Sequence, residues 1–475
     1  MKRISVFGLL IVLAACAPET PDMTGSAQVQ ATAPEALSLF VEDGGDGPWA
    51  MEIVLPEPDP VLFPRSNGAY REGSFSAHSD GVRLERIEGF DAILLPEGER
   101  RGRFEFVPYT DYIHAEYTPF LPFSDGGVAM FTGQFELLPA DSREAIAALN
   151  GDLDGWTGRQ LPVELTLRSP RTMLIGGEAI EGEATVRVDG NGQYVYFGDA
   201  TLTEGASFVG VLDPGLPDWL GSGLDDRLSV IFAALEDRFG FALKERATIL
   251  FAFGGYDTPG LSNSGGVLPG NVLALETEGA ALRDPDAQIL QRFQRFLAHE
   301  AVHLFQAMGG KSAASPDLAW IHEGGADAMS GQLLVELGFW EREARARYLA
   351  ADLERCVAAL SGSTLSETIR ESRIGAYDCG EIIAVASDAA LPGHDLYDLW
   401  ATLVSQADGE SDYAAADYFA AMASLGADES WLARLRTLVS DRATDPKQEF
   451  LDLMEAVGIE ANVKDGTVQS VTYPG

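Results

Sequence analysis

The stretch His299-Glu300-Ala301-Val302-His303 constrains this chain more than any other, because it sets two imidazoles four residues apart in a region of helical periodicity. Residues with this spacing lie on one face of a helix, one turn apart, so both side chains can reach a single metal ion. Glu300 directly follows the first histidine, where it can take a proton from a metal-bound water. The sequence therefore predicts a metal site on this helix. We expect the helix to begin with Asp284 as its cap and to end at Gly309-Gly310.

A third ligand should come from a neighbouring element, because two histidines leave a tetrahedral zinc ion one protein ligand short, with a fourth position open for water. The segment Trp320-Ile321-His322-Glu323-Gly324-Gly325-Ala326-Asp327 offers Glu323. We expect it on a second helix that Asp317 opens and that runs to about Leu337. The predicted ligands of one Zn²⁺ ion are thus His299, His303 and Glu323.

These two segments together resemble the gluzincin metallopeptidases, in which H-E-x-x-H is followed by a linker of this length and by a ligand Glu in a W-x-x-E-G-x-A-like helix. The resemblance implies a zinc-dependent peptidase with Glu300 as its general base. It also implies that Asp327, one turn beyond Glu323, accepts a hydrogen bond from His299 and fixes that ring. The alternative for Asp327 is a solvated helix charge.

An oxyanion donor is also expected, and Tyr377-Asp378-Cys379-Gly380 resembles the Y-x-K-G element of M1 aminopeptidase-like members. The resemblance implies that Tyr377 is catalytic, although Cys379 stands where the family has Lys. The alternative is a partly buried structural tyrosine. The other downstream candidates for the donor are Tyr348, His394, Tyr397, Tyr413 and Tyr418.

The substrate's amino terminus has no obvious anchor in this sequence. M1 aminopeptidases recognise the free amine through a G-x-M-E-N strand, whereas this chain has Ser264-Gly265-Gly266-Val267-Leu268-Pro269-Gly270-Asn271 there. The segment can still form an edge strand that pairs with a peptide backbone. Glu276 is the only substitute anchor that we consider.

The remaining histidines and cysteines are given structural roles. We expect His78 and His114 to lie outside any ligand cluster, and His322 to point away from the face that carries Glu323. Cys356 and Cys379 either form a disulfide or remain two buried thiols.

Residues 1–15 are interpreted as a signal peptide, with Lys2 and Arg3 before an apolar run. Leu13-Ala14-Ala15-Cys16 resembles the lipobox of bacterial lipoproteins, which implies cleavage before Cys16 and lipidation of that residue. The alternative is an ordinary secretory signal. The lipoprotein interpretation places the mature chain in the cell envelope, extracytoplasmic and lipid-anchored, and Ala17 after the cysteine favours the outer membrane.

The net charge of −40 excludes an electrostatic nucleic-acid binder, which needs a basic face. It also argues against contact with an anionic membrane beyond the lipid tether. The expected partner, a peptide or protein substrate, is what the gluzincin resemblance implies. The charge itself is typical of a solvated acidic surface and identifies no substrate.

The fold class predicted is α+β: a β-rich, sandwich-like domain, then a mixed zincin-type catalytic domain with C-terminal helices. The expected divisions are a tether over 16–46, the β-rich domain over 47–214 and the catalytic domain over 215–475. Asp189-Gly190-Asn191-Gly192 predicts a hairpin that joins strands at 184–188 and 193–197.

Three functions remain open from the sequence. The first is a zinc peptidase, and the second is an aminopeptidase with an atypical amine anchor. The third is a non-catalytic envelope lipoprotein whose zinc site is structural.

Overall fold

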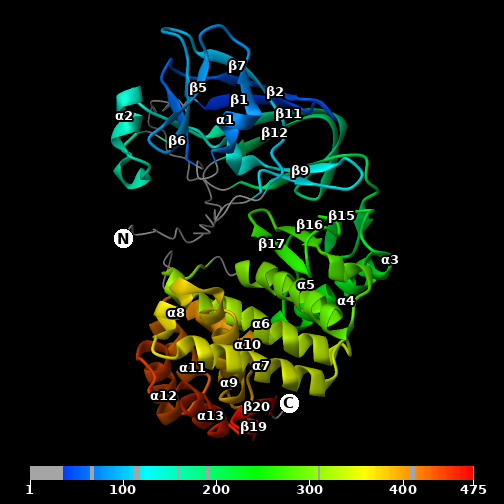
Figure 1. The fold of residues 1–475 in the computed structure, drawn as a ribbon, viewed down its shortest axis with the longest axis vertical. Coiled ribbons are helices and arrows are strands. Elements are labelled where there is room, and N and C mark those ends of the chain that lie inside the picture. Colours follow the sequence, from blue (N-terminus) through cyan, green and yellow to red (C-terminus); the bar gives the residue numbers. More distant parts are fainter. Residues whose placement is uncertain are drawn as a thin grey trace, which may run out of the picture.

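The computed structural model describes residues 36–64, 69–111, 118–158, 160–188, 192–308, 311–406 and 412–473. A β-rich domain is followed by a domain in which one sheet is covered by helices (Figure 1). This is the predicted α+β class. The predicted signal peptide, Cys16 and His114 lie outside the described residues.

The β-rich domain consists of two sheets that share one core. Residues that alternate along the strands point inward from both sheets, such as Met51 and Phe104 from the larger and Phe63 and Ile93 from the smaller. The nine-stranded sheet contains β1 (Leu37–Glu42), β2 (Trp49–Val54), β4 (Phe75–Ala77), β7 (Arg101–Phe106), β8 (Phe120–Pro122), β9 (Val128–Phe131), β11 (Val163–Ile175), β12 (Glu178–Val188) and β13 (Tyr194–Phe197). The four-stranded sheet contains β3 (Val61–Phe63), β5 (Arg83–Ile87), β6 (Phe90–Leu94) and β10 (Leu138–Pro139), and the domain's helices are α1 (Tyr70–Ser74) and α2 (Arg143–Ala148).

The tether predicted over 16–46 extends too far, because β1 lies inside it. Leu37, Leu39 and Val41 are buried, and the residues between them are less so. The strand pairs with β2 on one side and runs parallel to β11 on the other. This short alternation lies in a segment whose composition otherwise indicates a linker.

The predicted hairpin between 184–188 and 193–197 is wrong. β12 pairs with β11 through a turn at Gly176-Gly177, where both residues have positive φ as a tight hairpin turn requires. β13 instead pairs with β9 and with the far end of β11. Both sequence segments, 176–177 and 189–192, contain the glycines typical of hairpin turns. The long β11–β12 ladder closes at Gly176-Gly177.

The sheet of the second domain begins before the boundary predicted after residue 214. Its strands are β14 (Thr203–Glu204), β15 (Phe208–Leu212), β16 (Ala247–Phe253), β17 (Ser262–Leu268) and β18 (Val272–Glu278), in the order β14-β15-β16-β18-β17. β15 runs parallel to β16, so it belongs to the second domain. β17 is antiparallel to β18 and forms an edge, as the sequence predicts for this segment.

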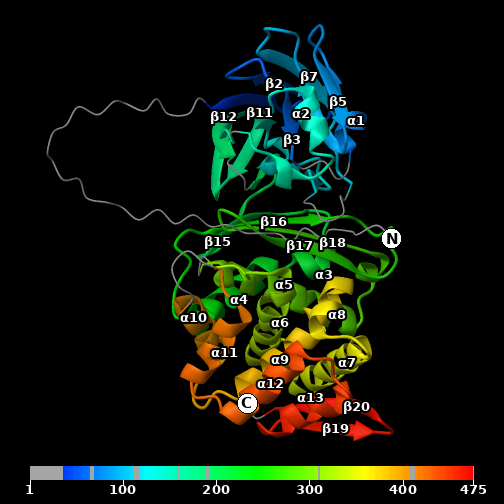
Figure 2. The same cartoon turned by 90° about the vertical axis from the view of Figure 1, so that its left-hand side faces the viewer.

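This sheet separates the β-rich domain from the helices (Figure 2). Alternate residues of its strands face opposite ways, and both faces are covered. Leu250 and Ala274 pack with Phe123 of the β-rich domain, whereas Phe251 and Leu273 pack with the helices. One continuous apolar layer therefore joins the two domains.

The helices of the second domain lie on one side of the sheet. They are α3 (Asp218–Gly221), α4 (Leu224–Phe239), α5 (Ala287–Ala307), α6 (Ala319–Glu336), α7 (Arg342–Leu360), α8 (Leu365–Glu371), α9 (Asp378–Ala389), α10 (Leu396–Gln406), α11 (Ala415–Ser424), α12 (Glu429–Ser440) and α13 (Pro446–Glu455), followed by a hairpin of β19 (Glu460–Lys464) and β20 (Thr467–Thr472). Within the described part of the chain, none of the helices combines the length and the apolar character that crossing a membrane requires.

The two motif helices start later than predicted. The cap of α5 is Asp286, whose Oδ1 accepts from the backbone N of Ile289 at 2.9 Å. Asp284, the predicted cap, instead lies two residues before this cap, at the end of the 3₁₀ turn Ala280–Arg283. Asp317 lies in a 3₁₀ turn capped by Ser315, and α6 begins at Ala319. The predicted stop at Gly309-Gly310 lies outside the described residues.

Candidate metal centre and active site

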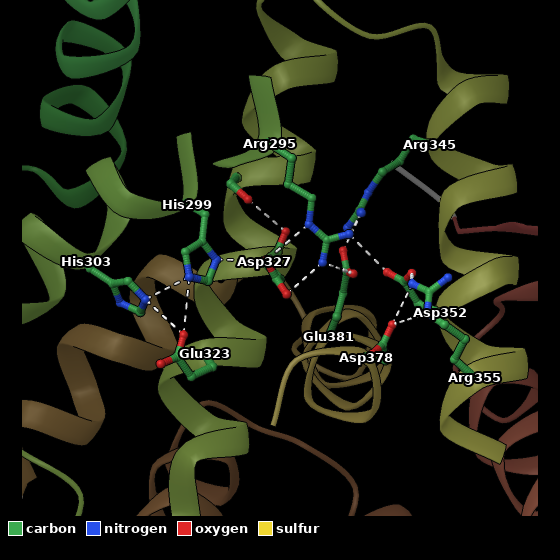
Figure 3. Close-up of polar contacts among 11 residues, drawn as sticks. Arg295, His299, His303, Glu323, Asp327, Arg345, Asp352, Arg355, Asp378 and Glu381 are labelled. Atoms are coloured by element: carbon green, nitrogen blue, oxygen red, sulfur yellow. Dashed lines mark hydrogen bonds and ion pairs between the residues drawn. The ribbon is translucent and has the colours of Figure 1, made fainter. Parts of the chain in front are cut away.

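The two histidines of α5 and Glu323 of α6 converge on one point (Figure 3). The Nε2 atoms of His299 and His303 are 2.9 Å apart. Glu323 Oε2 lies 3.2 Å from the first and 3.1 Å from the second. The structure thus brings together the three side chains that the sequence predicts as ligands.

The three donor atoms fit a zinc ion. Ligand atoms at 2.0–2.1 Å from a tetrahedral Zn²⁺ lie about 3.3 Å from one another, within a few tenths of an ångström of the spacing here. Two imidazole nitrogens and one carboxylate oxygen are also a donor set typical of catalytic zinc. Burial opposes charge on Glu323, but His303 and His299 outweigh it and hold the pKa of the carboxyl well below its usual range. The carboxylate is therefore ionised.

The second nitrogen of each imidazole is held by another side chain. His299 Nδ1 lies 2.7 Å from Asp327 Oδ1, and His303 Nδ1 lies 2.7 Å from Gln306 Oε1. The amide of Gln306 also donates to the backbone oxygen of His322 at 3.2 Å, which leaves its own oxygen to accept from His303. Both rings thereby present Nε2 to the metal position. Gln306 is absent from the sequence prediction, although its position three residues after His303 puts it on the same helix face.

Asp327 is itself bound by a buried arginine. Arg295 Nε donates to Asp327 Oδ1 at 3.1 Å, and its Nη2 lies 2.6 Å from Oδ2. Burial alone would raise the pKa of Asp327, but Arg295 and then His299 outweigh that effect and hold it well below its usual range. The carboxylate that orients His299 is therefore kept ionised by Arg295.

Arg295 connects the metal centre to two further helices (Figure 3). Its guanidinium donates to Asp352 of α7 at 3.1 Å and to Glu381 of α9 at 2.6 Å. Arg345 contacts Glu381 as well, and Arg355 contacts Asp352. The sequence reasoning missed this network. The one feature of the sequence that points to this network is the position of Arg295 four residues before His299, which places a charge on the buried face of α5.

Glu300 and the three candidate ligands line a cavity of about 740 Å³, which we name the active-site cavity. Burial, more than the nearby charges, raises the pKa of Glu300. Residues 263–267 of the edge strand β17 line the same cavity. Glu276, the substitute amine anchor, instead accepts from Ser264 Oγ at 3.4 Å and is not among the residues that line it.

Tyr377 lies in this cavity at the start of α9. Its ring stacks on that of His299, with centroids 5.7 Å apart and an interplanar angle of 27°. Burial and the charge of Glu323 raise the pKa of Tyr377 well above its ordinary value, so the phenol keeps its proton.

Two glycines bring α9 to this position. A Cβ atom on Gly324 would lie 2.1 Å from the carbonyl carbon of Gly380, and one on Gly380 would lie 2.7 Å from the backbone oxygen of Trp320. The backbones of α6 and α9 touch, which only glycine permits. These are the glycines that follow Glu323 and Tyr377 in the two motif segments.

The other donor candidates divide into two groups. Tyr413 and Tyr348 line the cavity; the first bonds His322 Nδ1 at 3.2 Å and the second lies under Arg295 at 4.4 Å. Tyr397 and Tyr418 are instead buried, where their hydroxyls donate to Met329 O and to Ser387 Oγ. His394 is exposed and pairs with Asp398.

The expectation for His322 is wrong. Its Nε2 lies 3.6 Å from Glu323 Oε1, and the residue lines the active-site cavity. The side chains of consecutive helix residues point in different directions, but the imidazole of His322 is long enough to turn back toward Glu323. The hydrogen bond between His322 Nδ1 and the Tyr413 hydroxyl holds the ring in this position. His78 pairs with Glu105 at 3.1 Å on the exposed surface of the β-rich domain.

Cys356 of α7 and Cys379 of α9 form a disulfide, with sulfurs 2.09 Å apart. Of the two alternatives left by the sequence, the structure has the bonded one. The bridge joins α7 to the first turn of α9, which carries Tyr377 at its start.

No protein-family model matches the sequence, and no curated protein matches it. Among solved structures, the fold is similar to that of an aminopeptidase N family protein from Idiomarina loihiensis, with a TM-score of 0.62 and 14% identity over 91% of this chain and 80% of that one. Two weaker similarities are to an M1 zinc metallopeptidase from Deinococcus radiodurans (TM-score 0.44, 15% identity, 86% of this chain, 92% of that one) and to leukotriene A4 hydrolase from Saccharomyces cerevisiae (0.48, 10%, 87% and 68%). The likeness is one of fold. It confirms the predicted class, a β-rich domain followed by a mixed domain with C-terminal helices.

Proposed function

We propose that this protein is a zinc-dependent peptidase that cleaves within peptide chains. One observation carries the proposal: three ligand atoms converge beside a buried glutamate in a cavity that has a sheet edge for one wall. The fold neighbours, which include zinc metallopeptidases, support the same class.

His299, His303 and Glu323 would hold the ion. Bound Zn²⁺ supplies a water with a pKa near 7 and polarises the substrate carbonyl. The edge strand β17 would pair with the extended peptide backbone and hold the scissile bond over the site.

Glu300 and Tyr377 would carry the proton and charge transfers. Glu300 accepts the proton of the attacking water and returns it to the leaving amine. Its raised pKa makes it a better proton carrier near neutral pH than an exposed glutamate. Tyr377, which keeps its phenolic proton, donates to the carbonyl oxygen as negative charge develops there.

Substitution of the two catalytic candidates tests the mechanism. We expect Glu300→Gln and Tyr377→Phe to bind one zinc per chain like the wild type, since neither residue is a ligand. Peptide hydrolysis should fall about 10²- to 10⁴-fold for the first variant and about 10²- to 10³-fold for the second. Zinc content is measured by elemental analysis and hydrolysis with a quenched fluorescent peptide. Zinc-loaded Glu300→Gln that hydrolyses the peptide at the wild-type rate would favour the structural-zinc alternative.

Cleavage of a free and an N-acetylated form of one peptide separates endopeptidase from aminopeptidase. The described part of the active-site cavity wall offers Ser264, Gly265 and Gly266 from β17 and no carboxylate from that strand. We therefore expect both peptides to be cleaved. Failure on the acetylated form alone would indicate an aminopeptidase with an atypical anchor.

We also propose that the mature protein is lipid-anchored in the cell envelope through Cys16. The support is the Leu13-Ala14-Ala15-Cys16 segment after an apolar run. In a bacterial host, the wild type should fractionate with membranes and incorporate labelled palmitate. Cys16→Ser should lose the palmitate label, and a label incorporated without the cysteine would refute the anchor.

A further inference from the structure

A second cavity, of about 710 Å³, opens beside the active-site cavity, between the first turns of α5 and one face of α7. We name it the adjoining cavity. Arg292, Tyr348, Arg355 and Asp378 line both cavities, so the two are continuous at these residues. The proposed mechanism uses no part of this space.

The adjoining cavity has two arginines that no carboxylate neutralises. Arg292 of α5 and Arg347 of α7 are exposed in its wall, and neither has an ion-pair partner in the described part of the chain. The carboxylates of the same wall, Asp352 and Asp378, are both engaged by Arg355. These two guanidinium groups therefore give the wall of this cavity a positive charge, although the net charge of the chain is −40.

The position of Arg292 matches a residue of a bound peptide near the scissile bond. Arg292 and the ligand His299 lie on the same helix, seven residues apart, which is about 10 Å along the axis. An extended peptide rises about 3.3 Å per residue, so this distance corresponds to roughly three residues. Arg292 and β17 line the same cavity, so a peptide that passes the metal in the direction of the α5 axis would bring a side chain two or three residues away into reach of Arg292.

We propose that the adjoining cavity is a substrate subsite that binds an acidic side chain two or three residues from the scissile bond, through Arg292 and Arg347. Guanidinium groups bind carboxylates through paired hydrogen bonds, and two of them at one opening exclude a lysine or arginine side chain. This inference rests on the proposed peptidase function and names its substrate class as acidic peptides.

The overall charge of the protein predicts the opposite preference. A chain of net charge −40 attracts cationic peptides over long range and repels anionic ones. The subsite therefore makes a distinctive prediction. Among peptides that differ at one position, Glu should be favoured over Gln, and Gln over Lys, but only when that position lies two or three residues from the cleaved bond.

The test uses short peptides, acetylated and amidated at their ends, in which Glu, Gln or Lys is moved along both sides of one scissile bond. For the wild type, we expect kcat/KM for Glu to exceed that for Gln at one such position. Arg292→Gln and Arg347→Gln should each lower this ratio about twofold to fivefold. Arg342→Gln is the matched control, because Arg342 is exposed on α7 and lines neither cavity; its ratio should equal that of the wild type.

The outcomes separate the subsite from the peptidase function. If peptides are cleaved without preference for Glu, or if Arg292→Gln and Arg347→Gln both retain the full preference, the subsite is wrong and the peptidase proposal stands. If no peptide is cleaved, the function is wrong, and binding decides the subsite. Zinc-loaded Glu300→Gln, with fluorescence anisotropy of labelled Glu and Lys peptides, should then bind the Glu peptide more tightly. Equal binding of the two overturns the subsite.

Discussion

Arg295 is the residue on which the geometry of the metal centre depends most without touching the metal position. It holds Asp327, which holds His299, and it does so from the helix that carries His299. Its guanidinium is balanced by carboxylates from three helices. Burial disfavours its charge, but Asp327, Glu381 and Asp352 outweigh that effect and raise the pKa of Arg295 well above its ordinary value.

Loss of this charge should weaken zinc binding. In Arg295→Met, Asp327 loses the cation that keeps it ionised, so its hydrogen bond with His299 is weakened. We expect zinc affinity, measured by chelator competition, to fall about 10- to 100-fold, the range found when a ligand's supporting residue is removed. Arg295→Lys should recover part of the loss because it restores the charge.

The matched control for this prediction is Arg345→Met. Within the described part of the chain, Arg345 contacts Glu381 of the same network but neither Asp327 nor the candidate ligands, so its loss tests general destabilisation. Wild-type zinc affinity in Arg295→Met would mean that the network serves folding alone.

At the scale of elements, the sequence predicts the parts that depend on local spacing. The H-E-x-x-H helix, the helix of Glu323, the strand at 247–253 and the edge strand near 264–271 all occur where periodicity or turn residues indicate them. The ligand group follows, because helix geometry fixes which side chains share a face.

The parts that depend on pairing between distant segments were not predictable in the same way. β13 pairs with β9, and β15 pairs with β16, in each case with a strand that lies far away in the sequence. The Arg295 network likewise needs Asp352 and Glu381, which approach only when α7 and α9 pack together. A single sequence carries little record of such contacts.

Over the whole molecule, acidic residues outnumber basic ones, 73 to 33, and some carboxylates lie close to one another. Asp388, at the end of α9, is partly buried and lies near Asp395. Burial, more than the nearby charge of Asp395, raises its pKa to about 6. The backbone N of Leu396 donates a hydrogen bond to Asp388 at 2.9 Å, which lowers the pKa but offsets only part of the effect of burial.

This shift predicts how one substitution changes stability with pH. The folded state binds the proton of Asp388 more tightly than the unfolded chain, so stability falls as pH rises from about 4 to about 6, and the full penalty is present above that range. Asp388→Asn cannot ionise and still offers an oxygen to Leu396. We expect it to raise the free energy of unfolding by on the order of 1 kcal/mol at about pH 8 and to have no effect near pH 4. Urea denaturation at the two pH values checks this, and an equal effect at both would rule out ionisation as its cause.

The contact between Gly324 and Gly380 has a consequence for how this architecture can change over evolution. Gly324 follows the candidate ligand Glu323, and Gly380 lies three residues after Tyr377, which lines the active-site cavity. Neither position can gain even a methyl group while the two backbones touch. The helices that carry Glu323 and Tyr377 therefore depend on each other: a larger residue in place of either glycine would push α6 and α9 apart and move the phenol away from the candidate ligands, however well the rest of each motif were preserved.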